Sequence, residues 1–169
     1  MKRLFIPMAA VLLLLGACQA PGPKNQLFDS GPEVDNIAKN IKSYVDGDWA
    51  AFRAAYADTA KSYHNNGTMT LDSLVQFHKM ARNNYDKVEI ITYATEYVKF
   101  EKQGDFTHFW GLWRGTVKGT GKVVETNVHI ACRMVNGKIG TEYVYYDPTP
   151  IVAALTEARE AAMASQPKK

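Results

Sequence analysis

The 169-residue sequence predicts an α+β fold in which helices come first and an antiparallel β-sheet follows. Up to Asn84, apolar residues recur mainly at the spacing of amphipathic helices. After Asn84, long runs rich in β-branched and aromatic residues indicate strands. The dipeptide Asn136-Gly137 separates two of these runs and favours the type I′ turn of a tight hairpin. These observations predict one domain.

Three helices are expected before the sheet. Apolar residues at intervals of three and four predict a helix over residues 33–45. Gly47 interrupts this pattern, and Asp48 can cap a second helix by accepting a hydrogen bond from its free amide groups. A short strand is expected at residues 61–64, and Thr70 can then cap a third helix.

Four longer strands and a last helix complete the expected domain. The strands are predicted at residues 88–101, 106–117, 123–135 and 138–146. The C-terminal helix is expected from about Pro150 to Ala164. Because short turns join the consecutive strands, the sheet should be antiparallel.

The hairpin at Asn136-Gly137 predicts which residues share a face. If these two residues form the loop, Val135 pairs with Lys138. If the pairing then continues without interruption along both strands, it determines which side chains lie on each face of the sheet. The face expected to be buried holds Val128, Ile130, Cys132, Met134, Ile139, Thr141, Tyr143 and Tyr145. The opposite face holds Asn127, His129, Ala131, Arg133, Val135, Lys138, Glu142, Val144 and Tyr146. Arg133 and Glu142 are therefore expected to form an ion pair on this second face.

The strand over residues 106–117 leaves its orientation open. Aromatic residues alternate between its faces, and the loop after it does not fix the register with the next strand. One register turns Trp110, Leu112 and Arg114 inward, whereas the other turns Phe109 and Trp113 inward. An inward tryptophan could line a ligand pocket, and an outward Trp110 or Tyr146 would mark a dimer interface.

The first eighteen residues resemble a bacterial lipoprotein signal peptide. A basic start is followed by an apolar run over residues 4–15, which is too short to span a bilayer, and by Leu15-Gly16-Ala17-Cys18. The resemblance implies that residues 1–17 are removed and that Cys18 is acylated. Because Gln19 follows the cysteine, it also implies the cell envelope, at the outer membrane of a Gram-negative bacterium.

Composition sets the remaining boundaries. Residues 18–32 are rich in proline and glycine and predict a flexible tether. The domain is expected to span residues 33–164, and residues 165–169 are expected to form a polar tail.

Charge and cysteine content limit the expected partners. Cleavage removes two positive charges, so the formal net charge falls from +3 to +1 and nucleic acid is not an expected partner. Besides Cys18 the chain has one cysteine, Cys132, so neither a disulfide, a metal site nor a cofactor is expected.

The domain is similar to the nuclear transport factor 2-like superfamily over roughly residues 33–155. The similar motifs are Gly47-Asp48-Trp49, Tyr56-Ala57-Asp58-Thr59-Ala60, Trp113-Arg114-Gly115-Thr116, Asn136-Gly137-Lys138-Ile139 and Tyr145-Tyr146-Asp147. The resemblance implies a cone-shaped, curved sheet wrapped around the N-terminal helices, with an apolar pocket at its open end. Members often dimerise through the outer face of the sheet. They include SnoaL-like polyketide cyclases, ketosteroid isomerases and proteins that only bind.

Comparison with the enzymes of this superfamily gives a mixed result for catalysis. The position of their inward acid falls on Ile130, and that of the oxyanion tyrosine falls on Asn40, with Tyr44 one turn further. The position of their general base falls on His64, which could act as a base. The missing acid favours a binding protein over an enzyme. The residues expected around the pocket are Tyr44, Tyr63, His64, Trp113, Ile130, Tyr143 and Tyr145.

Three functions remain open on this basis. The leading hypothesis is a lipid-anchored protein that binds a small apolar ligand in the cone. The alternatives are an isomerase-like or cyclase-like enzyme with His64 as base, and a non-catalytic module that dimerises or binds another protein. An acid brought beside His64 by the fold, such as Asp72 or Glu142, would favour the enzyme.

Overall fold

The computed structural model describes residues 24–165. Its elements, in chain order, are β1 (Gln26–Phe28), α1 (Pro32–Asp46), α2 (Trp49–Ala54), β2 (Tyr56–His64), β3 (Gly67–Thr70), α3 (Leu71–Arg82), β4 (Tyr85–Phe100), β5 (Gly104–Val117), β6 (Val123–Val135), β7 (Lys138–Tyr146) and α4 (Thr149–Ala164). This order confirms the α+β prediction, with helices before the four long strands.

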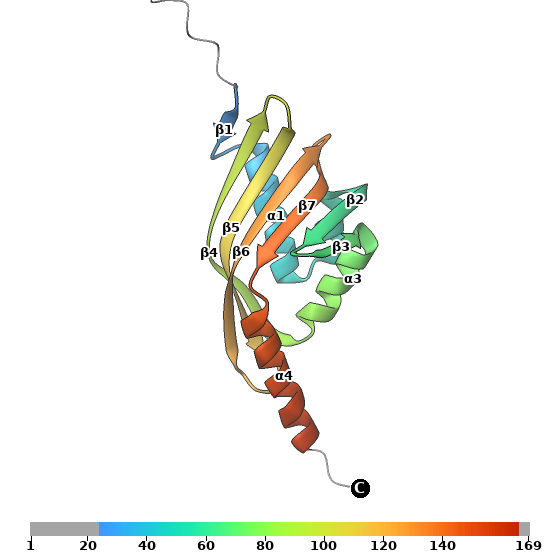
Figure 1. Ribbon diagram of the computed structural model, residues 1–169, viewed down its shortest axis with the longest axis vertical. Coiled ribbons are helices and arrows are strands. Elements are labelled where there is room, and N and C mark those ends of the chain that lie inside the picture. The colour runs from blue at the N-terminus through green and yellow to red at the C-terminus, as the bar shows by residue number, and fades with distance from the viewer. Residues whose placement is uncertain (1–23, 166–169) are drawn as a thin grey trace, which may run out of the picture.

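All seven strands belong to one curved sheet in the order β1-β4-β5-β6-β7-β2-β3. Neighbouring strands are antiparallel, except that β2 runs parallel to β7. Figure 1 shows β4 to β7 side by side, with α3 beside the sheet and α4 extending beyond its end. Helix α1 packs on β4 and β5, α3 packs on β2, and α4 packs on β6. The sheet therefore wraps around the N-terminal helices, as predicted.

Local capping explains where the helices begin and end. The Asp48 side chain accepts a hydrogen bond from the Ala51 amide at the start of α2, as predicted. Thr70 accepts one from the Ser73 amide at the start of α3, also as predicted. Helix α1 ends at Gly47, whose φ of 74° is the left-handed conformation that glycine adopts without strain.

The hairpin between β6 and β7 confirms the predicted turn but not the predicted faces. Asn136 and Gly137 have φ angles of 50° and 75°, and Val135 pairs with Lys138. Met134 pairs with Ile139, but Arg133 pairs with Thr141, so Gly140 forms a β-bulge. A Cβ atom at residue 140 would lie 2.7 Å from Cγ2 of Val135, so only glycine fits without displacing that side chain.

The bulge reverses the faces of β7 after Gly140. Glu142, Val144 and Tyr146 turn to the inner face, and Thr141, Tyr143 and Tyr145 turn to the outer face. The predicted assignment of this strand was therefore wrong beyond Ile139. The predicted ion pair of Arg133 with Glu142 was wrong for the same reason, because the two side chains lie on opposite faces.

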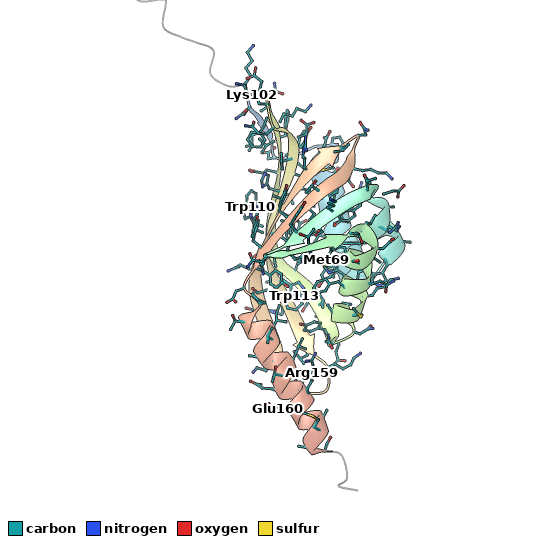
Figure 2. The ribbon with its side chains drawn as sticks, turned by 45° about the vertical axis from the view of Figure 1, so that its right-hand side comes forward. Met69, Lys102, Trp110, Trp113, Arg159 and Glu160 are labelled. Carbon is teal, nitrogen blue, oxygen red and sulfur yellow. The ribbon has the colours of Figure 1, made fainter. Side chains whose placement is uncertain are left out.

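Strand β5 adopts the register that turns Phe109 and Trp113 inward. Both side chains are buried, whereas Trp110 is 40% exposed. Trp110 and Trp113 lie on opposite sides of the sheet in Figure 2. Phe109 packs in a core cluster under α1 to α3, and Trp113 packs in a second cluster with Ala154 of α4. The cavity described below lies where these two clusters meet.

Part of the segment predicted to be a tether forms a strand. Within the predicted tether, Gln26–Phe28 pairs with Tyr97 to Lys99 of β4 and adds an edge strand to the sheet. Strand β2 also begins earlier than expected, at Tyr56. The signal peptide, Cys18 and residues 166–169 lie outside the described residues. Within residues 24–165, none of the helices is long and apolar enough to cross a membrane.

Candidate functional site

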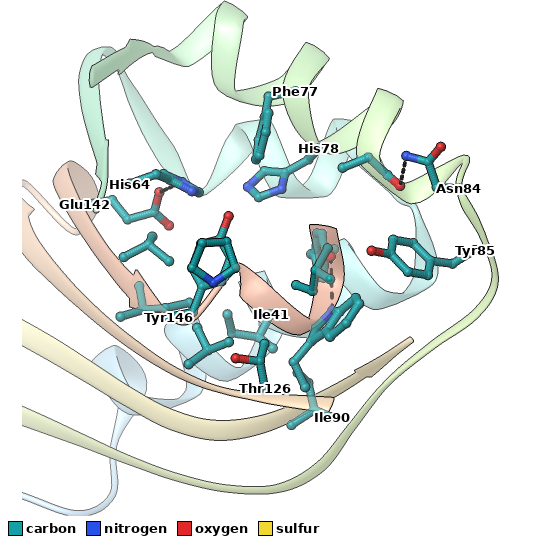
Figure 3. A pocket seen from close by; sticks show the side chains of 18 of the residues that line it. Ile41, His64, Phe77, His78, Asn84, Tyr85, Ile90, Thr126, Glu142 and Tyr146 are labelled. Atoms are coloured by element: carbon teal, nitrogen blue, oxygen red, sulfur yellow. Dashed lines mark hydrogen bonds and ion pairs between the residues drawn. The ribbon is translucent and has the colours of Figure 1, made fainter. Parts of the chain in front are cut away.

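A cavity of about 440 Å³ lies between the helices and the inner face of β5 to β7. Its walls come from α1, α3, the inner strand residues and the first turns of α4. Most of the lining is aliphatic or aromatic, including Ile41, Ile90, Phe109, Trp113, Ile130 and Leu155. Figure 3 shows a polar group at one end, where His64 and Glu142 lie beside each other next to Phe77 and His78. Such an apolar pocket with few polar groups is typical of small-molecule sites.

Glu142 is a buried carboxylate held by two hydroxyl groups. Its side chain points inward because of the bulge at Gly140, and only 3% of the residue is exposed. The Tyr56 hydroxyl donates a hydrogen bond to Oε1 over 2.7 Å, and the Ser62 hydroxyl donates one to Oε2 over 2.5 Å. Both donors come from β2, the strand next to β7.

His64 lies beside this carboxylate at the end of β2. Its Nε2 is 3.6 Å from Oε2 of Glu142, which suits an ion pair but is long for a hydrogen bond. Both ring nitrogens are buried, and neither has a hydrogen-bond partner among residues 24–165. The ring packs against Phe77 and His78, with ring centres 5.5 Å away in each case. An unpartnered buried imidazole in a cavity wall makes His64 a candidate functional group.

The charge state of Glu142 follows from these neighbours. Burial raises the pKa of this carboxyl, but His64 and the Ser62 hydroxyl stabilise the charged form, so the net shift is downward. Glu142 is therefore ionised at neutral pH. Burial and the adjacent charge of Glu142 raise the pKa of the Tyr56 hydroxyl well above its usual value, which keeps Tyr56 a hydrogen-bond donor.

His78 is the centre of a cluster of rings in the same wall. Its ring centre lies 5.0 Å from that of Tyr44 and 5.3 Å from those of Phe52 and Phe77. Burial lowers its pKa from 6.5 to about 4, despite the nearby negative charge of Glu142. His78 is therefore neutral at pH 7.

Tyr44 offers a second polar group to the cavity. The Trp113 indole donates a hydrogen bond from Nε1 to the Tyr44 hydroxyl oxygen over 3.2 Å. Because this bond uses the oxygen as acceptor, the hydroxyl proton of Tyr44 can still be donated to a ligand. Burial raises the pKa of Tyr44, so the group stays protonated.

The structure brings four of the seven predicted pocket residues together. Tyr44, His64, Trp113 and Ile130 all line the cavity. Tyr63, Tyr143 and Tyr145 lie on the outer face, where Tyr63 stacks on Tyr143 with ring centres 5.2 Å apart and Tyr145 is 51% exposed. The two β7 tyrosines were placed wrongly because the bulge was not foreseen. Tyr63 alternates with His64 along β2, so the two side chains cannot share a face.

Reasoning from sequence missed several cavity residues. Glu142 was expected outside, and Asp72 pairs with Arg53 on the surface instead of approaching His64. Phe77, His78 and Tyr146 also line the cavity. The signal for Glu142 was Gly140, because a glycine inside a strand often marks a bulge.

Metal and thiol chemistry find no support in the described residues. Within residues 24–165, no three His, Cys, Asp or Glu side chains are grouped to hold a metal ion. Cys132 is buried, and burial raises the pKa of its thiol well above the usual value. The thiol is therefore an inert part of the core.

Comparison with known proteins identifies the fold. No family model matches the sequence, and no curated protein matches it. A proposed polyketide cyclase from Xanthomonas campestris matches with a TM-score of 0.62 and 13% identity, over 73% of this chain and 96% of that one. AclR, a proposed hydroxylase from Streptomyces galilaeus, matches with a TM-score of 0.60 and 12% identity, over 74% and 96%. A nuclear transport factor 2-like protein from Burkholderia xenovorans matches with a TM-score of 0.57 and 18% identity, over 73% and 95%.

The chain has the nuclear transport factor 2-like fold. This confirms the resemblance inferred from the sequence motifs. At 12–18% identity these matches show the fold alone, and function must be argued from the cavity. In this nuclear transport factor 2-like domain the carboxylate of the cavity comes from β7, at Glu142, while Ile130 on β6 is part of the apolar wall.

Proposed function

We propose that this protein binds a small, largely apolar molecule in the cavity of its nuclear transport factor 2-like domain. The observation that carries the proposal is the cavity of about 440 Å³, which falls within the usual range of small-molecule pockets. Its wall is mainly apolar, and the polar groups of Tyr44, His64 and Glu142 could orient a ligand. A cavity left empty would forgo many packing contacts.

The neutral fluorophore N-phenyl-1-naphthylamine tests this proposal with the chain from Gln19 onward. We expect saturable binding with increased emission. Ile151→Trp places a large ring in the cavity wall on α4, and we expect it to weaken binding about tenfold or more. Met163→Trp is the matched control, because Met163 is exposed near the end of the same helix and should leave binding unchanged. Equal binding by the two variants would contradict the proposal.

The proposed site of action is the cell envelope. The lipobox at Leu15-Gly16-Ala17-Cys18 supports a lipid on Cys18, with Gln19 favouring the outer membrane. Metabolic labelling with radioactive palmitate should label the natural chain, and Cys18→Ala should abolish the label. A natural chain that takes up no label would argue against the lipid anchor.

A homodimer is a further part of this proposal. Trp110 and Tyr145 are exposed on the outer face, and aromatic residues are enriched at protein interfaces. The mass of the chain in solution, measured by light scattering across a concentration range, distinguishes a dimer from a monomer.

Catalysis by His64 is a second candidate function, favoured by the position of Glu142. A carboxylate beside the imidazole can fix its orientation and stabilise the imidazolium that forms when it accepts a proton. Two similar structures carry enzyme descriptions, a polyketide cyclase and a hydroxylase. Exchange of the α protons of 2-tetralone in deuterated water tests this. An enzyme would accelerate the exchange, and His64→Gln would abolish the acceleration.

A further inference from the structure

The fixed charge among the described residues of the cavity wall is negative and comes from Glu142. Among the described residues that line the cavity there is no lysine, arginine or aspartate, and Glu142 is the one glutamate. Its carboxylate is ionised and almost fully buried. Arg82 on α3 does not line the cavity, and its Nη1 donates to the backbone oxygen of Tyr85. The charge of Arg82 acts on Tyr44, where it opposes the rise in pKa that burial causes. No positively charged side chain is among the described lining residues, however, so an anionic ligand would lie directly against the negative charge of Glu142.

The carboxylate of Glu142 has hydrogen bonds but no fixed counter-charge. Tyr56 and Ser62 each donate a hydrogen bond to it, and neither carries a positive charge. Buried charges in proteins are normally paired. His64 can supply a positive charge when protonated, and it helps to lower the pKa of Glu142. Its Nε2 is nevertheless 3.6 Å from Oε2, and neither ring nitrogen has a hydrogen-bond partner among residues 24–165. A cation on the ligand would be the alternative counter-charge.

Aromatic rings gather at the same end of the cavity. The ring centres of Tyr44, Phe52 and Phe77 lie 5.0–5.3 Å from that of His78, and all four residues line the cavity. His78 is neutral, so it adds a ring without adding a positive charge. Figure 3 shows Phe77 and His78 next to His64 and Glu142. Rings of this kind attract alkylammonium groups through their negative faces, and such groups are recognised by aromatic cages.

We propose that the ligand of this cavity is an apolar amine or quaternary ammonium compound, with its alkylammonium group among these rings beside Glu142. This inference rests on the proposed binding function. The remaining part of the ligand lies against the apolar wall at Ile90 and Trp113. Because the alkyl groups of such a cation shield its charge, it loses less hydration on burial than a metal ion or a primary ammonium would.

Two probes of the same shape test the proposal. Benzyltrimethylammonium and neopentylbenzene differ in one atom, nitrogen against carbon, and therefore in one charge. Each is titrated against the chain from Gln19 onward with bound N-phenyl-1-naphthylamine, and the released fluorescence gives its affinity. We expect the cation to bind at least about tenfold more tightly than the neutral probe. Equal affinities, or tighter binding of neopentylbenzene, would overturn the inference without need of any variant.

Variants identify the source of the preference. Glu142→Gln keeps the shape and removes the charge, so we expect the ratio of the two affinities to fall towards one. Glu125→Gln is the control, because Glu125 pairs with Arg114 at the surface and should leave the ratio unchanged. A ratio that is unaffected by Glu142→Gln would overturn the role of this carboxylate. Failure of both probes and of the fluorophore to bind would instead count against the proposed binding function itself.

Discussion

Replacing Glu142 by alanine is expected to lower the free energy of unfolding by about 2–6 kcal/mol, because two buried hydrogen-bond donors lose their acceptor at about 1–3 kcal/mol each. The substitution leaves the buried hydroxyls of Tyr56 and Ser62 without their acceptor. It also removes the negative charge beside His64. Since domains of this size are stable by only about 5–15 kcal/mol, the loss is a large share of the total. Urea unfolding followed by circular dichroism at pH 7 measures it.

Glu125→Ala is the matched control for this effect. Glu125 lies on β6, next to β7, and its carboxylate accepts a hydrogen bond from Nε of Arg114 over 2.6 Å. Both side chains of this pair are more than a third exposed, so the expected loss is only about 0–1 kcal/mol. Similar losses in the two variants would show that Glu142 does not organise the interior as described.

The parts of the fold that depend on local sequence signals were predictable. Asp48 and Thr70 cap helices because a side-chain oxygen can reach an amide three residues on, and this needs no tertiary contact. Asn136 and Gly137 form the turn because both tolerate positive φ angles. Strand β1 was not predictable in this way. Gln26–Phe28 is short, and its partner strand lies some seventy residues later in the chain.

The candidate site could be predicted only in part, because it depends on the register of one strand. His64 was found through the position of the base in similar enzymes, and β2 does carry it to the cavity. Its partner Glu142 was assigned to the outer face, because an uninterrupted ladder was assumed. A single extra residue at Gly140 moves every later side chain of β7 to the other face. The bulge at Gly140 therefore decides whether the cavity is entirely apolar or contains the buried carboxylate of Glu142.

The pH dependence of stability should report the burial of His78. The pKa of His78 is lowered from 6.5 to about 4, so the unfolded chain takes up a proton in this range while the folded chain does not. Above pH 6.5 the ring is neutral in both states, and the free energy of unfolding does not depend on its protonation. As the pH falls from 6.5 towards 4, protonation of the unfolded chain lowers the free energy of unfolding. This loss amounts to about 3 kcal/mol, because one pKa unit corresponds to about 1.4 kcal/mol. Glu142, whose pKa is also lowered, adds a further loss of stability as the pH falls below its usual value of 4.5.

His78→Phe should remove this part of the pH dependence, because phenylalanine fits among Tyr44, Phe52 and Phe77 and carries no titrating group. We expect the variant to lose about 3 kcal/mol less than the natural protein between pH 6.5 and 4, measured by urea unfolding at several pH values. His78→Leu packs differently but should give the same slope, which separates titration from packing. His108, whose pKa is also lowered by burial, is present in all three proteins and cancels in the comparison. Parallel curves for the three proteins would mean that His78 takes up its proton in the folded state as readily as in the unfolded chain, and that the ring is open to water and not enclosed in the cavity wall.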